Sequence, residues 1–190
     1  EQDGTYPLPE AQMDRFMFKL VVYNPSLEEL KGIVSMTQKT MGEVANVACN
    51  AEQLLAMRET ANQIPVADEV LTFAMTLISA THPDSECASE AAKKYVRLGS
   101  SPRGGQALIS AAKVLALMNG RFNVSYSDVA TLAFPVLRHR MKMNFEAIAE
   151  RVSPDEVIRM ILTEVCKKCN VRLDAGSLNT AETGANKKNK

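Results

Sequence analysis

Serine-headed helix-start signals recur along this chain of 190 residues and constrain its fold more than any other feature. Ser26, Ser125 and Ser153 are each followed three residues later by an acidic residue. In such a capping box the serine oxygen accepts a hydrogen bond from the third helical amide, and the acidic side chain bonds back to the serine amide. Ser101-Pro102 is a fourth signal, with serine at the cap and proline at the first helical position. The chain is therefore predicted to be mainly α.

The remaining boundaries follow from polar caps, apolar spacing and helix breakers. The expected helices begin at Leu27, Ala51, Asp68, Pro102, Tyr126 and Pro154, and a short helix follows the polar loop 83–92. Gly42 and Gly120 are the expected stops of two of them. Pro135 is expected to bend or break its helix, because proline lacks the amide hydrogen. These signals predict six or seven helices.

One segment has the character of a strand. Residues 16–23 are almost continuously apolar, which is typical of a strand buried on both faces of a parallel sheet. No second clear strand exists for it to join, so we expect it to be the remnant of a sheet that belongs to a missing domain. Residues 174–190 are rich in Gly, Asn, Thr and Lys, and we expect a disordered tail there.

Composition excludes several classes of protein. Lys plus Arg equals Asp plus Glu at 22 each, so the net charge is zero, which argues against a nucleic-acid binder. No apolar run approaches the ~18–20 residues of a membrane span. The four cysteines, with no signal peptide in view, favour reduced thiols and a cytoplasmic protein.

Cys166 and Cys169 have the spacing of half a zinc site or of a redox pair. A zinc site needs two more ligands, and His82 and His139 lie far apart in the sequence. A thioredoxin-like motif needs a βαβ context, which the pattern lacks. We therefore interpret both cysteines as incidental residues at a helix end and expect no metal site.

Two arginines are the candidates for phosphate chemistry. Arg15 follows Asp14 directly before the apolar segment, where the simplest interpretation is a surface ion pair worth under ~1 kcal/mol. Arg103 falls in the first turn of a predicted helix, where its charge opposes the helix dipole. An anionic partner would explain a basic residue at that position. The alternative is that Arg103 points into solvent or meets an acidic neighbour.

Longer strings of residues around the two arginines carry a family resemblance. Residues 7–16, ending in Asp14-Arg15-Phe16, resemble the segment that carries the arginine finger of the MoxR-type AAA+ ATPase family. Residues 99–104 match its sensor-2 motif, usually Gly-Ala-Ser-Pro-Arg, with Ser100 in place of the alanine. The resemblance continues through residues 120–129, the Leu-Arg-His-Arg run at 137–140 and residues 143–150, and covers about residues 1–165.

The resemblance implies an AAA+ helical lid bundle preceded by a loop and one residual strand of the α/β ATPase core. It divides the chain into a core remnant at 1–24, a helical lid at 25–173 and a tail at 174–190. In that family Arg15 would act in trans as an arginine finger on the nucleotide of a neighbouring subunit. Ser101, Pro102 and Arg103 would contact the nucleotide phosphates in the same subunit.

The resemblance also implies a hexameric ring that hydrolyses ATP with Mg²⁺, remodels protein clients in a chaperone-like manner and often works with von Willebrand A-domain proteins. Arg138, His139 and Arg140 are a possible interface with a neighbouring subunit, and a solvated basic turn is an equal alternative. The Gly99–Gly104 spacing is that of a phosphate loop, but Gly105-Gln106 occupies the Lys-Ser/Thr positions. We therefore expect the 190 residues alone to be inactive.

Two other functions remain open on the residues. A stand-alone helical adaptor that binds a protein partner without nucleotide would explain the missing phosphate loop. A helical DNA-binding module would use residues 125–140, but the neutral net charge counts against it.

Overall fold

The computed structural model describes residues 8–37 and 46–173. These residues form two compact units, one made of 8–19 together with 61–173 and the other lying within 20–60. The predicted tail at 174–190 and the predicted stop at Gly42 lie outside the described residues. The domain boundaries expected at residues 24 and 173 stay predictions.

The smaller unit contains α2 (Leu27–Thr37) and all but the last two residues of α3 (Ala51–Asn62). Both helix starts are capped as predicted. The Ser26 amide donates to the Glu29 carboxylate at 2.8 Å, and the Glu29 amide donates back to the Ser26 hydroxyl at 3.3 Å. Asn50 and Gln53 form the equivalent reciprocal pair with bonds of 2.8 and 2.9 Å.

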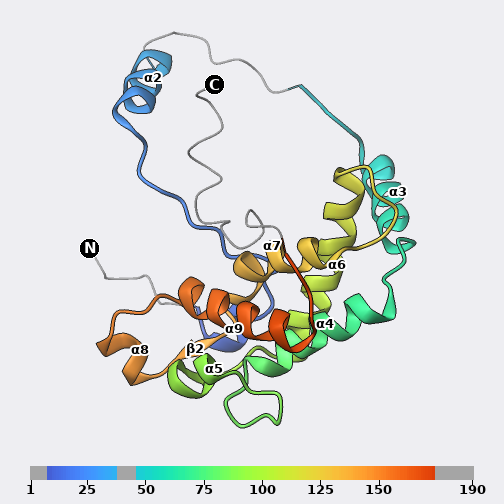
Figure 1. Ribbon diagram of the computed structural model, residues 1–190. Helices are drawn as coiled ribbons and strands as arrows, with labels where there is room; N and C mark the ends of the chain where they lie inside the picture. The colour runs from blue at the N-terminus through green and yellow to red at the C-terminus, as the bar shows by residue number, and fades with distance from the viewer. Residues whose placement is uncertain (1–7, 38–45, 174–190) are drawn as a thin grey trace. The chain divides into compact units, whose positions relative to one another are not determined.

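The larger unit is a set of helices with one very small sheet. Its elements in chain order are α1 (Glu10–Met13), α4 (Asp68–Ala80), α5 (Glu90–Tyr95), β1 (Val96–Leu98), α6 (Pro102–Met118), α7 (Tyr126–Leu137), β2 (Lys142–Met143), α8 (Phe145–Ala149) and α9 (Pro154–Lys168) (Figure 1). The prediction of a mainly helical fold is confirmed. Helix α8 had not been expected.

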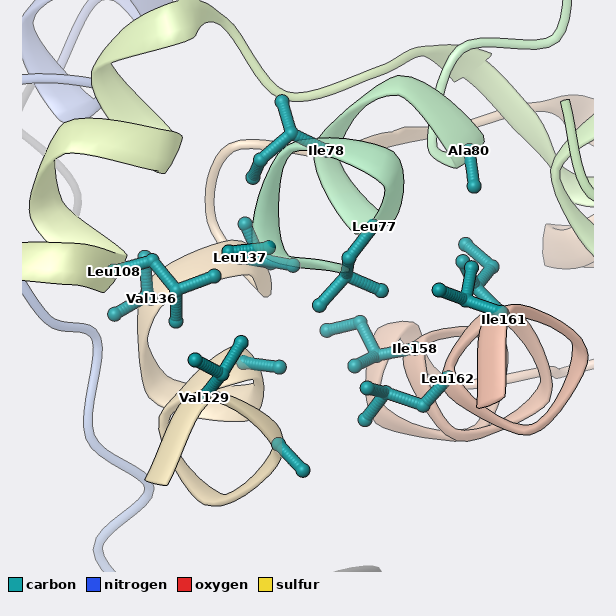
Figure 2. Close-up of a cluster of buried hydrophobic side chains, with 14 of the residues drawn as sticks. Leu77, Ile78, Ala80, Leu108, Val129, Val136, Leu137, Ile158, Ile161 and Leu162 are labelled. Atoms are coloured by element: carbon teal, nitrogen blue, oxygen red, sulfur yellow. The ribbon is translucent and has the colours of Figure 1, made fainter. Parts of the chain in front are cut away.

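The core of the larger unit lies between α4, α6, α7 and α9. Helix α4 packs against the other three, and α6 packs along α7. Figure 2 shows Leu77 of α4 facing Ile158 and Leu162 of α9. All three side chains are buried, and each such side chain contributes about 1.5–3 kcal/mol relative to an exposed one. Burial of apolar helix faces therefore holds this unit together.

The predicted strand at residues 16–23 is wrong. Residues 18–26 have no regular secondary structure, and the carbonyls of Phe16, Met17 and Lys19 accept hydrogen bonds from side chains instead of a neighbouring strand. A strand needs an adjacent backbone to bond with, and the described residues offer none at this place. The sheet lies elsewhere: β1 and β2 pair antiparallel, with Val96 opposite Met143.

The two predicted helix breakers behave differently. Helix α6 ends at Met118, and Gly120 adopts a positive φ of 69°, as the predicted C-terminal stop requires. Helix α7 continues through Pro135 to Leu137. The carbonyl of Pro135 accepts a 2.9 Å hydrogen bond from the Lys19 amide, so this turn also holds the N-terminal segment. Among the described helices, none has the length and apolar character needed to cross a bilayer.

Candidate functional site

Arg15 and Arg103, predicted independently along the sequence, line the same open depression. Its volume is about 610 Å³. The lining residues are Asp14, Arg15, Met17, Arg103, Gln106, Ala107, Ser110 and Arg140, and we call this surface the two-arginine groove. One wall is the first part of α6 and the other is the segment that follows α1.

The start of α6 is built differently from those of α7 and α9. Ser101 stands at its N-cap with an extended backbone, and Pro102 is the first helical residue, as predicted. The Ser101 side chain, however, makes no capping bond to the helix. Arg103 is the second helical residue, and its side chain is 58% exposed. The positive end of the helix dipole and an exposed guanidinium thus lie together at the N-terminal end of α6.

The turn before α6 is fixed by the end of α4. The Ser100 amide donates to the Thr81 hydroxyl at 2.9 Å, and the His82 ring nitrogen Nε2 lies 2.8 Å from the Ser100 carbonyl. Gly104 permits a close approach here, because a Cβ atom would lie 2.0 Å from the Ser100 hydroxyl and 3.2 Å from Arg140 Cδ. The position of Arg103 is therefore set by buried neighbours on both sides.

Asp14 joins the two walls of the groove. The Ser101 hydroxyl donates to both Asp14 carboxylate oxygens, at 2.9 and 3.0 Å. Arg103 Nη1 lies 3.5 Å from Asp14 Oδ2, and Arg140 Nε lies 3.4 Å from Oδ1 without the alignment of a hydrogen bond. One carboxylate thus faces two guanidiniums and a hydroxyl from distant parts of the sequence.

Arg15 is exposed, and its side chain forms no ion pair with any residue that the structure describes. Its amide donates to the Gln12 carbonyl at 3.1 Å, which fixes the backbone as the chain leaves α1. Asp14, beside it in the sequence, pairs with Arg103 and Arg140 rather than with Arg15. Arg15 is therefore the groove cation that is open to an incoming anion.

Arg138, His139 and Arg140, the basic triplet, bind the backbone of residues 14–19. Arg140 donates to the carbonyls of Asp14 at 3.1 Å, Phe16 at 2.7 Å and Met17 at 3.2 Å. Arg140 is only 5% exposed and His139 only 7%. These two side chains face their own chain, and the interface of the basic triplet with a neighbouring subunit stays a prediction.

The other two members of the basic triplet complete this attachment. Arg138 donates to the Lys19 carbonyl at 2.8 Å and forms a two-bond ion pair with Asp155, at 2.8 and 2.9 Å. The His139 ring nitrogen Nε2 lies 2.9 Å from the Phe16 carbonyl. Burial, aided by the charge of Arg140, holds the pKa of His139 below its ordinary value.

The two cysteines of the CxxC pattern lie at the end of α9. Burial raises the pKa of the Cys166 thiol, which makes its reactive thiolate scarcer. Both are free thiols. Within residues 8–37 and 46–173, no group of three or more His, Cys, Asp and Glu side chains is arranged to hold a metal ion.

Sequence reasoning singled out Arg15 and Arg103 but missed the role of Asp14. The Asp14-Arg15 pair had suggested a local ion pair, whereas the partners of Asp14 lie 87 to 126 residues away. It also missed that the basic triplet binds backbone carbonyls. No spacing rule could have found either contact, since both depend on how the N-terminal segment lies on the helices.

Comparison with known proteins identifies the class to which this arrangement belongs. The family profile described as the AAA lid domain matches residues 88–161, from the loop before α5 into α9. A crystal structure of a "putative ATPase" from Cytophaga hutchinsonii superimposes with a TM-score of 0.78 at 31% identity, covering 86% of this chain and 50% of that one. The fold is thus that of an AAA lid domain with a segment packed at its side.

Three curated relatives identify the family. Chaperone MoxR1 of Mycobacterium tuberculosis is 35% identical over 165 residues, 87% of this chain and 44% of that protein. YeaC of Bacillus subtilis, described as uncharacterized, is 33% identical, and Protein MoxR of Paracoccus denitrificans is 27% identical. The chain belongs to the MoxR family of AAA+ ATPases and corresponds to their lid-bearing C-terminal region. It spans about half the length of the curated relatives it matches.

Proposed function

We propose that the complete protein hydrolyses ATP in a hexameric ring and that the two-arginine groove is the surface that meets the phosphates. Arg15 would be the arginine finger and Arg103 the sensor 2. The observation that carries this proposal is that both arginines line one groove at the uncapped start of α6. Ser101 and Pro102 contribute by setting the direction of that helix start.

The electrostatics of the groove favour a polyanion. Two exposed guanidiniums, those of Arg15 and Arg103, line it against one carboxylate, and the positive end of the α6 dipole adds to their charge. A guanidinium donates two parallel hydrogen bonds to phosphate oxygens. An arginine finger that stabilises the charge developing on a transferred phosphoryl group is worth about 10³–10⁵ in rate. Arg15 suits this role because it is exposed and forms no ion pair with the described residues.

The geometry favours one nucleotide for both arginines. The family resemblance assigns Arg103 to the nucleotide of its own subunit and Arg15 to that of a neighbour. Two side chains on one open groove reach the same phosphate group more readily than two separate ones. We therefore propose that Arg103 and Arg15 act together on the nucleotide of a neighbouring subunit.

ATP and Mg²⁺ are the cofactors that this reaction requires. The groove residues fit phosphate oxygens but not the metal, because the one carboxylate, Asp14, already bonds Ser101 and faces Arg103. We propose that Mg²⁺ and the β- and γ-phosphates are held by residues outside this chain. The 190 residues alone would then be inactive.

The chemistry would serve chaperone-like remodelling of protein complexes in the cytoplasm. Chaperone MoxR1 is named for such a role. Protein clients and a von Willebrand A-domain partner are part of the proposal, because the family resemblance implies them.

The test is a comparison of the complete protein with its Arg15→Ala variant. We expect the complete protein to hydrolyse ATP and the variant to bind ATP normally while losing about 10³-fold or more in turnover. Arg172→Ala is the matched control, since Arg172 is exposed and lies outside the groove. Full turnover by Arg15→Ala would remove the finger assignment, and tight calorimetric binding of ATP·Mg²⁺ to the 190 residues alone would contradict the proposed division of labour.

A protein-interaction adaptor without nucleotide is the second candidate. Phe145 and Ile148 of α8 are 82% and 67% exposed, and because residues three apart share a helix face, together they offer an apolar surface to a partner. Absence of ATP hydrolysis by the complete protein, with binding of a protein partner lost on Phe145→Ser, would favour this alternative.

A further inference from the structure

The Asp14 carboxylate occupies the place in the two-arginine groove where an anionic ligand would meet Arg103. It faces Arg103 Nη1 at 3.5 Å while accepting two hydrogen bonds from Ser101. The Arg103 side chain is 58% exposed, but that of Asp14 is only 19% exposed. The carboxylate is therefore the fixed member of the pair and Arg103 the movable one.

We propose that Asp14 is a positioning residue that acts in two separable ways. Through its charge it holds Arg103 while the groove is empty, so a nucleotide phosphate must compete with it. Through its hydrogen bonds to Ser101 it fixes the backbone that carries Arg15. This inference rests on the proposed function, because it assigns a regulating contact to the same groove.

The competition follows from the chemistry of the two anions. A carboxylate and a phosphate use the same donors of a guanidinium, and Arg103 has one exposed fork to offer. An exposed ion pair is weak, so the phosphate can displace the carboxylate at a modest loss of affinity. The pair thus moderates nucleotide binding without preventing it.

The positioning follows from the adjacency of Asp14 and Arg15. The Asp14 carbonyl accepts a hydrogen bond from Arg140, and its carboxylate accepts those of Ser101. Asp14 is therefore tied to the helical body from both its backbone and its side chain. Arg15, the next residue, leaves this fixed point towards the groove.

The test separates charge from hydrogen bonding in the complete protein. Asp14→Asn keeps an oxygen that can accept from Ser101 but removes the charge. We expect KM for ATP and the Kd of Mg²⁺ with a non-hydrolysable ATP analogue to fall about twofold to fivefold, with kcat retained. Asp14→Ala removes both contacts, and we expect the same lower KM with kcat reduced about tenfold to a hundredfold, since small misplacements of catalytic groups cost that much.

Two further variants are controls. One tests whether the loss of any nearby carboxylate has the same effect, and the other tests whether the effect of Asp14 acts through Arg103. Glu10→Gln removes a carboxylate from α1 that faces Arg97 and Lys142 rather than Arg103, and we expect KM to stay unchanged. In an Arg103→Ala background Asp14→Asn should no longer alter KM, because the competing pair is already gone. A thermal melt of each variant checks folding, and the Asp14→Asn and Arg103→Ala results decide the matter if Asp14→Ala does not fold.

The outcomes distinguish this inference from the proposed function. A complete protein that neither binds nor hydrolyses ATP overturns both. Turnover that depends on Arg15, with Asp14→Asn indistinguishable from Glu10→Gln, overturns the role of Asp14 alone. Equal losses of kcat in Asp14→Asn and Asp14→Ala with no change in KM indicate a merely structural residue and overturn it as well.

Discussion

The N-cap residue of α6 is a serine, as in α7 and α9, yet its side chain has a different bonding partner. Ser125 and Ser153 each accept the third amide of their own helix and complete a capping box with Asp128 and Glu156. Ser101 instead donates its hydroxyl to Asp14 in a segment 87 residues earlier. A serine whose hydroxyl caps its own helix stabilises that helix. A serine whose hydroxyl makes no capping bond is available to attach another part of the chain.

The difference also separates stability from function within the larger unit. The starts of α7 and α9 are closed by their own side chains, which bond the third helical amide and the amide of the capping serine. The start of α6 keeps its first-turn amides without a side-chain cap and faces an open groove. Four predictions test this contrast between the helix starts, beginning with the largest expected effect.

The closed start of α7 should be the most sensitive to loss of a charge partner. Asp128 is buried, and although burial alone would raise its pKa, hydrogen bonds from Arg121 and Ser125 bring the pKa below its ordinary value. Arg121→Met leaves this carboxylate without its two-bond partner, and we expect a loss of about 3 kcal/mol in the free energy of unfolding. Urea denaturation measures it, with Arg172→Met expected to change stability by less than about 0.5 kcal/mol. Equal losses in the two variants would contradict the importance of this helix start.

The open start of α6 should resist added volume. Gly104→Ala places a Cβ against the Ser100 hydroxyl, and we expect a loss of about 1–3 kcal/mol by overpacking. In a Ser100→Ala background most of this loss should disappear, because the added Cβ then meets only Arg140 Cδ at 3.2 Å and the Cβ of residue 100 at 3.4 Å, which are much milder contacts. Thermal melts of the two single variants and the double variant give the coupling, and additive effects would show that the predicted clash is relieved elsewhere.

The N-cap serines of α9 and α6 should differ in the residue to which each is energetically coupled. Ser153→Ala should cost about 1 kcal/mol. Part of this cost should be lost in a Glu156→Ala background, because the bond between the two side chains is then absent while the backbone amide of residue 156 still donates to the Ser153 hydroxyl. Ser101→Ala should couple to Asp14→Ala instead. Double-mutant cycles by urea denaturation measure both couplings. If Ser101→Ala has the same effect with and without Asp14, the contrast between the helix starts breaks down.

The smallest expected effect is the pH dependence of folding stability. It concerns the contact made with the segment that contains Asp14. The unfolded chain binds a proton on His139 near the ordinary pKa of 6.5, whereas the folded chain binds it only at lower pH. Stability should therefore fall as the pH is lowered from 6.5 towards the folded pKa. His139→Gln should reduce the difference in melting temperature between about pH 7.5 and about pH 5.5. An unchanged difference would mean that His139 does not titrate on unfolding.

The sequence predictions were accurate where the interacting residues lie close together in the sequence and failed where they lie far apart. Helix starts were predicted correctly at Ser26, Ser125 and Ser153, because a capping box lies within four residues. The side-chain cap of α8 by Asn144 is just as local and could have revealed that helix. By contrast, the strand predicted at 16–23 was wrong, because an apolar run specifies no partner.

The candidate site shows the same limit. Arg15 and Arg103 were chosen from short motifs, but their presence on one groove depends on contacts between residues about 90 apart. The pairing of β1 with β2 likewise joins Val96 to Met143 and leaves no signal in strands of two or three residues. Contacts that are distant in the sequence are thus the part that only a structure provides.

The basic triplet binds its neighbouring segment by carbonyl oxygens, which every amino acid possesses. Exposed side chains at Phe16, Met17 and Phe18 take little part in that attachment. Natural variation or deliberate redesign of those three side chains should therefore leave the path of the chain intact. A comparison of related sequences would then find less variation in the basic triplet than in the segment it binds, even though Arg15 lies in that segment.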